Sequence, residues 1–195
     1  MDRERLGRAL RAIDAANADD PNRIQVRGAW RPKELAHAEL ASEWIERLEP
    51  EPSEALRLAA RAHHLRRFEL PRSAYPGGRL GYLRWRAALQ ELHAERVAGL
   101  LSGEGYDEAT IRRVQDLVRK RGLGRDPEVQ VLEDALCLIF LETQLAELAR
   151  RLEPARLLEV LRRTLRKMSP GAVAAARGLA LDPEERALLE SAAAG

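Results

Sequence analysis

The 195-residue sequence lacks several features that would assign it to a specialised class of protein. It contains one cysteine and 4% aromatic residues, and its net charge is only +2 although 33% of its residues are charged. One cysteine cannot form a disulfide within the chain, and charges of balanced sign do not favour nucleic acid or a membrane surface as a partner. The alternation of β-branched and polar residues that is typical of strands is missing as well. From these absences we expect a cytoplasmic protein whose single cysteine stays a free thiol.

Long apolar runs are also absent. No stretch is long enough to cross a bilayer, and the chain opens with Asp2, Arg3, Glu4 and Arg5 instead of the apolar core of a signal peptide. We therefore expect a soluble protein with no membrane partner. Cys137 lies in an apolar stretch, which predicts a buried side chain of low reactivity.

Alanine, leucine, arginine and glutamate dominate the sequence and predict an all-α fold of about eight to nine helices. No repeat or linker divides the chain, so we expect a single helical-bundle domain over residues 1–195, with 153–195 as a C-terminal helical extension packed on it. The predicted helices cover about 3–17, 32–48, a segment beginning at 53, 79–102, 107–121, 127–152, 154–168 and two segments beginning at 170 and 183.

Glycine and proline mark the predicted loops. Residues 24–31 are expected to form a loop because of Gly28 and the following Pro32, and residues 71–78 have the most loop-like composition. The apolar block from Ala135 to Leu141 predicts that its helix is the central and most buried element.

The stretch from Ala60 to Arg67 carries the strongest functional signal. His63 continues an apolar helical stripe formed by Leu56, Ala59 and Ala60, and His64 follows it directly. Neutral imidazole is the commonest metal ligand and a frequent acid or base near neutral pH. The alternative interpretation is an ordinary core histidine beside a solvated one.

Polar side chains occupy apolar faces elsewhere too. All four histidines, His37, His63, His64 and His93, fall within residues 37–93, and Asp134 lies on the face of the predicted central helix that is most apolar. A buried carboxylate without a partner is costly, so Asp134 should be paired or bound to a metal. We therefore expect the segments bearing His37, His63, His64 and Asp134 to converge on a metal site. Separate buried salt bridges are the alternative.

Five motifs carry a resemblance to a known family: Pro32-Lys33-Glu34-Leu35, residues 61–72, Gly81-Tyr82-Leu83-Arg84-Trp85-Arg86, Leu92-His93-Ala94-Glu95 and residues 132–138. Together with Tyr75-Pro76 they closely resemble the family of domain of unknown function 4202 (DUF4202) over nearly the whole chain. The layout of that family is similar to the HD-domain metal-dependent phosphohydrolases, which are named for a His-Asp pair.

The resemblance to HD proteins implies a set of metal ligands. His37 matches the first ligand, His63-His64 the pair and Asp134 the last ligand. His64 stands where these proteins have an aspartate, and a nitrogen ligand favours a transition metal over magnesium. Residues 118–121 are largely basic where two-metal members place further histidines, so a single divalent ion is expected: zinc, iron, manganese or nickel.

By the same resemblance the protein is expected to be a phosphohydrolase that acts on a small phosphorylated metabolite or nucleotide. Glu133 or His93 would transfer the proton, and cationic side chains would neutralise the phosphoryl oxygens. The candidate phosphate-binding residues are Arg66, Arg67, Arg72, Arg84, Arg86 and Lys120.

Two other functions remain open. The first is a non-catalytic module that binds a nucleotide or, less favoured, RNA, with stacking on one of the aromatic residues Trp30, Trp85, Tyr75 or Tyr82. The second is a structural helical protein that presents residues 153–190 to a partner. Metal content separates the enzyme from the binding module.

Overall fold

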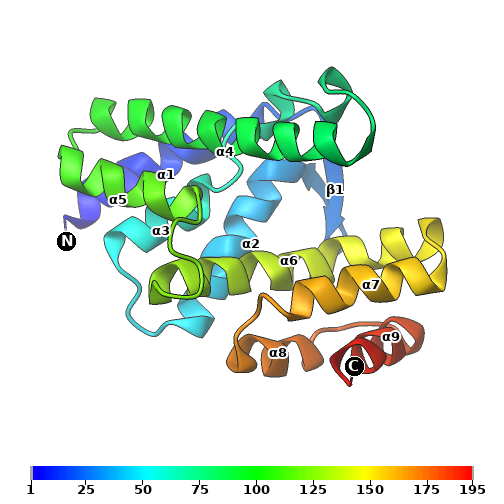
Figure 1. Cartoon of the computed structure of the whole chain (residues 1–195). Helices are drawn as coiled ribbons and strands as arrows, with labels where there is room; N and C mark the ends of the chain where they lie inside the picture. The colour runs from blue at the N-terminus through cyan, green and yellow to red at the C-terminus, as the bar shows by residue number, and fades with distance from the viewer. Residues whose placement is uncertain (1, 195) are drawn as a thin grey trace.

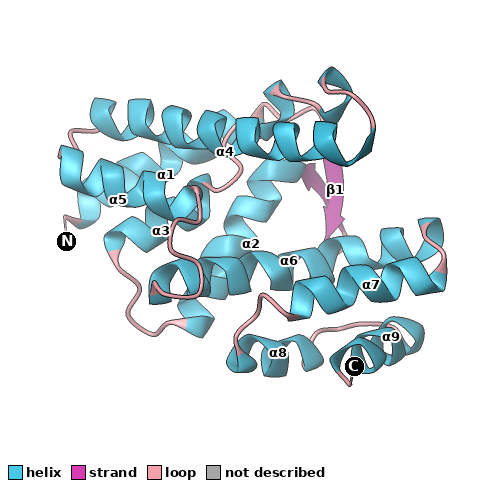
Figure 2. Cartoon of the chain, in the orientation of Figure 1, coloured by secondary structure: helices cyan, strands magenta, loops and turns pink. Residues whose placement is uncertain are grey.

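The computed structural model describes residues 2–194, and helices dominate it (Figures 1 and 2). Within that range the elements are α1 (Arg3–Ala18), β1 (Arg23–Val26), β2 (Ala29–Pro32), α2 (Lys33–Leu48), α3 (Glu54–Ala62), the 3-10 helices η1 (Arg67–Glu69) and η2 (Arg72–Ala74), α4 (Gly78–Gly103), α5 (Glu108–Val118), α6 (Pro127–Arg151), α7 (Pro154–Leu165), α8 (Pro170–Arg177) and α9 (Pro183–Ala193). The all-α prediction and the predicted number of helices are confirmed.

Local signals in the sequence explain where the helices begin. The side chains of Ser53, Asp107 and Asp126 each accept hydrogen bonds from backbone N–H groups in the first turn that follows them. Asp182 and Glu185 form a complete reciprocal capping box at the start of α9. Such caps satisfy N–H groups that have no partner within the helix, so these boundaries could be predicted closely.

The prediction of a loop at residues 24–31 is wrong. β1 and β2 form an antiparallel hairpin in which Val26 pairs with Ala29. Arg27 and Gly28 make the two-residue turn, and both have positive φ angles, 52° and 82°. Turns of this kind favour asparagine or aspartate followed by glycine. Because arginine occupies the first position here, the sequence lacks the usual signal for a hairpin.

The double-histidine segment also differs from the prediction, because α3 ends at Ala62. His63 is the C-cap residue of that helix, and His64 lies in the turn that follows. Arg66 then adopts a left-handed conformation with φ of 52°, and its N–H donates to the buried side-chain oxygen of Asn17. The chain thus leaves the helix at the histidines and is anchored to α1 immediately afterwards.

Helix α6 forms the centre of the hydrophobic core, as predicted. Leu132, Ala135, Leu138, Leu141 and Leu145 follow helical spacing and are all buried. The helix packs against α2, α3 and α5 and also against α7, α8 and α9. Figure 1 shows α4 along one side of the molecule and α6–α9 along the other, with α2 and α3 between them. The site described below lies between these two sides.

The last three helices share the same core. α7 packs against α6 and α9, and α8 packs against α6. None of the described helices is both long enough and apolar enough to cross a membrane.

The core predicts a large effect of truncating Leu138. Leu138→Ala should lower the free energy of unfolding by about 2–5 kcal/mol, because it removes a fully buried side chain and leaves a cavity in the central helix. Urea unfolding followed by circular dichroism measures the change. Leu80→Ala is the matched control, since Leu80 is 63% exposed, and it should cost about 0.5 kcal/mol or less. Equal losses for the two variants would contradict the assignment of the core.

Candidate metal centre and anion-binding cavity

All four histidines gather in one region between α2, the turn after α3, and α4. The ring centroids of His63 and His64 are 4.2 Å apart, those of His64 and His93 5.7 Å, and those of His37 and His64 6.2 Å. His37, His63 and His93 are buried, whereas the side chain of His64 is 29% exposed. The structure therefore brings together imidazoles that are up to 56 residues apart in the sequence, from His37 to His93.

Backbone carbonyls set the orientation of two of these rings. Nδ1 of His63 lies 2.8 Å from the carbonyl oxygen of Ala60, and Nδ1 of His93 lies 3.0 Å from that of Leu65. A carbonyl accepts only, so Nδ1 carries the hydrogen and Nε2 keeps a lone pair. Burial lowers the pKa of His63 to about 3 and that of His93 to about 4. Both rings are thus neutral acceptors near pH 7, and Nε2 of His93 is buried without a hydrogen-bond partner among the described residues.

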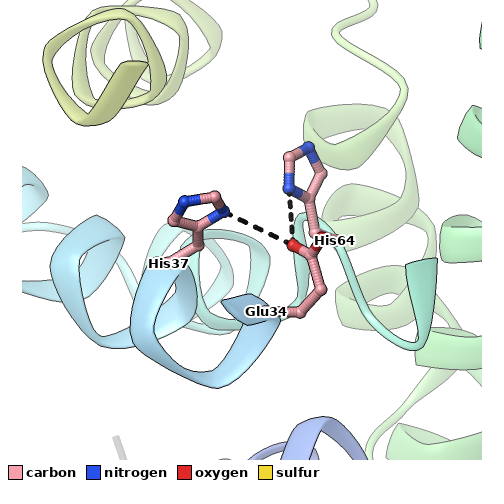
Figure 3. A group of neighbouring side chains, drawn as sticks. All are labelled: Glu34, His37 and His64. Atoms are coloured by element: carbon pink, nitrogen blue, oxygen red, sulfur yellow. Dashed lines mark hydrogen bonds and ion pairs between the residues drawn. The ribbon is translucent and has the colours of Figure 1, made fainter. Parts of the chain in front are cut away.

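Glu34 joins the other two histidines. Its Oε2 lies 3.0 Å from Nδ1 of His64 and 3.5 Å from Nδ1 of His37, as Figure 3 shows. Burial alone would raise the pKa of this carboxyl group, but His64 and the hydrogen bonds from both imidazoles outweigh burial and hold the pKa well below its usual range. Burial lowers the pKa of His64, so that its neutral ring donates from Nδ1. Glu34 is therefore an ionised carboxylate that orients two imidazoles.

The start of α2 supports this buried charge. Glu34 lies in the first turn of the helix, where the helix dipole favours an anion. Its backbone N–H donates to the side chain of Asp20, which is itself buried, at 3.0 Å. Nε of Arg67 approaches the other carboxylate oxygen of Glu34 at 3.8 Å. The position of Glu34 is thus set by contacts on several sides.

Glu34, His37 and His64 form the candidate metal centre. Across residues 2–194 they are the one group of three metal-capable side chains whose ligand atoms all lie within 4.8 Å of one another. Ligands bound at about 2.1 Å to one ion are about 3.0–3.4 Å apart, and the two distances to Oε2 are close to this range. Two imidazoles and one carboxylate suit a divalent transition metal and leave coordination positions open. The residues present therefore fit such an ion, which would displace the hydrogens on Nδ1.

The structure does not place Asp134 in this group. Its Oδ1 accepts hydrogen bonds from the side chain of Gln130 and from the backbone N–H of Ser169, both at 2.9 Å. Ser169 is the N-cap residue of α8, so the buried carboxylate connects α6 to α8. The apolar face of α6 was identified correctly, but at Asp134 that face meets the start of α8.

A cavity of about 380 Å³ adjoins the histidines. Its walls come from α4, the end of α5, α6, α7 and the turn after α3. His63, His64 and His93 line it together with one carboxylate, Glu133. The cationic lining residues are Arg67, Arg86, Lys120, Arg163 and Lys167. A concave site with this excess of positive charge favours an anionic ligand.

Glu133, predicted to transfer a proton, is bound to two lysines. Lys120 forms an ion pair with its Oε2, and Nζ of Lys167 lies 3.5 Å from its Oε1. Burial raises the pKa of Glu133, but the two lysines outweigh burial and bring it below the ordinary value. Lys120 has a left-handed backbone with φ of 57°, directly after the end of α5. The arrangement indicates that Glu133 holds the two ammonium groups in place.

Three of the six predicted phosphate-binding residues line the cavity: Arg67, Arg86 and Lys120. The other three do not. Arg66 forms ion pairs with Asp19 and Glu69, Arg72 donates to the carbonyl oxygens of Tyr75 and Pro76, and Arg84 is exposed on α4. The sequence could not distinguish the arginines that line the cavity from those that do not. All of them lie near the histidines in the sequence, but the turns after α3 direct Arg66 and Arg67 to different parts of the structure.

Several residues of the site were not predicted. Glu34 lies one helical turn before His37 on α2, and this i, i+3 spacing was the available signal. Arg163 lies in the last turn of α7 and Lys167 just after its end, on the segment that the sequence predicts only as a partner surface. Their side chains face the cavity because α7 packs against α6.

Cys137 is buried, as predicted, and also lines the cavity. Burial raises the pKa of its thiol to about 12. A thiol of this kind is protonated near pH 7 and therefore a poor nucleophile.

The family model described as domain of unknown function (DUF4202) matches residues 7–189, which is most of the chain. No curated protein and no solved structure matches the sequence. The likeness to HD-domain phosphohydrolases stays a prediction.

The contacts of Asp134 predict a structural effect. Asp134→Ala should lower the free energy of unfolding by about 1–3 kcal/mol, because the partly buried N–H of Ser169 and the amide of Gln130 lose their acceptor. Zinc affinity, measured by titration with a competing chelator, should stay within about twofold of the parent value. A loss of zinc binding with unchanged stability would instead make Asp134 a ligand.

Burial of neutral His93 predicts a pH-dependent stability. The unfolded chain takes up a proton at this ring below about pH 6.5, whereas the folded protein does so only below about pH 4. The contribution of His93 to stability is therefore present above pH 6.5 and decreases by about 3 kcal/mol as the pH falls to 4. Urea unfolding at a series of pH values should show a flatter profile for His93→Gln than for the parent. Parallel profiles would contradict the assignment.

Proposed function

Since the chain belongs to the family of domain of unknown function 4202 and membership alone assigns no chemistry, we propose from the site that it hydrolyses a small phosphorylated metabolite or nucleotide with the help of a divalent transition metal. One observation carries the proposal. His64 belongs both to the candidate metal group and to the lining of the cationic cavity. An anion in the cavity would therefore lie beside the metal-binding side chains.

The candidate ion would be zinc, iron, manganese or nickel, because two nitrogen ligands disfavour magnesium. When bound, it would supply Lewis-acid activation of water and of the phosphoryl group. The residues that would hold it are Glu34, His37 and His64.

The chain's own residues supply binding and orientation. Arg67 and Arg86 offer guanidinium donors that match phosphoryl oxygens, and Nη1 of Arg67 lies 3.3 Å from Nε2 of His64. Arg67 is held on its other side by the ring of Trp85, whose centroid is 4.8 Å away. Nε2 of His93 adds a neutral acceptor beside this group. With a pKa of about 4, His93 suits the positioning of a hydroxyl group or a water better than strong base catalysis.

The size of the cavity supports a small ligand. Its volume of about 380 Å³ lies in the range of sites for metabolites and nucleotides, which are enclosed by protein on several sides. Tyr82 lines the cavity and is 45% exposed, so it could stack on the base of a nucleotide.

Non-catalytic binding of the same class of ligand is a second candidate. One observation favours it: Glu34 already has a hydrogen bond with His64 and close contacts with His37 and Arg67, so the group is stable as a network without an ion. In this case the cavity would bind the phosphorylated compound and release it unchanged.

Replacing Glu34 tests the proposed function. Glu34→Gln should weaken zinc or manganese binding by about tenfold or more, because the only anionic ligand is lost, and should abolish metal-dependent hydrolysis of p-nitrophenyl phosphate. Elemental analysis and the release of p-nitrophenol measure the two effects. Glu46→Gln, on the exposed face of the same helix, is the matched control and should change neither. If the parent protein binds none of the four metals and hydrolyses nothing, the non-catalytic candidate replaces the enzyme.

A further inference from the structure

The cations of the cavity form two groups, each organised around a different carboxylate. In the first group, Arg67 contacts both Glu34 and His64, and Arg86 lies near enough to Arg67 to affect it electrostatically. Lys120 and Lys167 lie on the side of Glu133 and contact both of its oxygens. The first group comes from the turn after α3 and from α4, and the second from the ends of α5 and α7.

Each group has more positive than negative charge. Glu34 balances one of the two arginines, and Arg86 has no ion pair with any residue that the structure describes. Glu133 balances one of the two lysines, and Arg163 adds a further guanidinium whose nearest carboxylate is that of Glu159, 3.4 Å away on the exposed side of α7. The side chains of Arg67 and Lys120 are only 24% and 22% exposed, so each group holds one cation with little access to solvent. Negative charge from a ligand at both places would offset the excess of positive charge.

The arrangement of the second group is specific. The ionised Glu133 is 3% exposed and receives one lysine on each oxygen, which fixes both ammonium groups at the cavity wall. Lys120 reaches this position from a left-handed backbone conformation that an L-residue adopts only at a cost. Neither group needs the other for its internal contacts, so each can bind an anion independently.

We propose that the ligand of this cavity carries two separate anionic groups, as a bisphosphorylated metabolite does. One phosphate binds Arg67 and Arg86 beside His64, and the other binds Lys120, Lys167 and Arg163. The inference rests on the proposed function, since it assigns the reacting phosphate to the end of the cavity beside the candidate metal group. The cavity is large enough for an organic linker between the two ends.

Calorimetric titration with stable phosphonates tests the proposal. The probes are a series of α,ω-alkane bisphosphonates and the alkylphosphonates of the same chain length, none of which can be hydrolysed. The best bisphosphonate should bind the full-length protein about tenfold or more tightly than its one-ended counterpart, because a linked second group binds at high effective concentration. Equal affinity of the two probes across the series would overturn the proposal.

Two variants locate the ends. Arg86→Gln and Lys167→Gln should each weaken binding of the bisphosphonate, whereas only one of them should weaken binding of the alkylphosphonate. Arg166→Gln is the matched control, because Arg166 is exposed next to Lys167 and does not line the cavity. If both variants weaken both probes by the same factor, the cavity holds a single anion.

The outcomes also separate this proposal from the proposed function. Hydrolysis of p-nitrophenyl phosphate with no preference for bisphosphonates would reject the two-ended ligand and leave the phosphohydrolase standing. Tight bisphosphonate binding without metal binding or hydrolysis would reject the phosphohydrolase and leave the two-ended ligand standing. If neither class of phosphonate binds at millimolar concentration and p-nitrophenyl phosphate is not hydrolysed, both proposals fail.

Discussion

The candidate site depends on one buried ion, the carboxylate of Glu34. It lies in the first turn of α2, accepts a hydrogen bond from His64 in the turn after α3, and lies 3.5 Å from Nδ1 of His37 on its own helix. A buried charge is tolerated only where polar partners replace the water that it has lost. Here those partners include the histidines that could bind a metal ion. The same contacts therefore connect α2 to the turn after α3 and hold the rings of His37 and His64 in place.

Two buried carboxylates near the cavity, Glu34 and Glu133, each contact basic side chains of its lining. Glu34 contacts two imidazoles and an arginine and so orients them, whereas Glu133 contacts two lysines, whose like charges would otherwise repel one another. Such pairing keeps cations at the wall of a partly enclosed space without losing the local excess of positive charge. Electrostatics and packing thus act together on the side of Glu133, because α5 and α7, which lead to the two lysines, both pack against α6, the helix that carries Glu133.

The elements of this fold could be predicted from local signals, whereas the membership of the site could be predicted only in part. Caps such as Ser53 and Asp126 act within one turn, and the apolar stripe of α6 shows directly which face is buried. Asp134 satisfied the same criterion of a polar group on an apolar face, yet it meets α8, because the sequence does not show which neighbour covers a face. Glu34 could not be recognised as a site residue from the sequence, since an acidic residue in the first turn of a helix commonly only stabilises the helix.

The contribution of α7 to the cavity bears on the order in which the cavity can form during synthesis. Lys167 completes the lysine pair around Glu133, although it follows that residue by 34 positions and comes after the end of α7. During synthesis from the N-terminus, Lys167 emerges after all four histidines and Glu133, and the lysine pair cannot form until α7 has packed on α6. A ligand that contacts both His64 and Lys167 would bind only after this docking, and its binding would therefore stabilise the docked C-terminal helices.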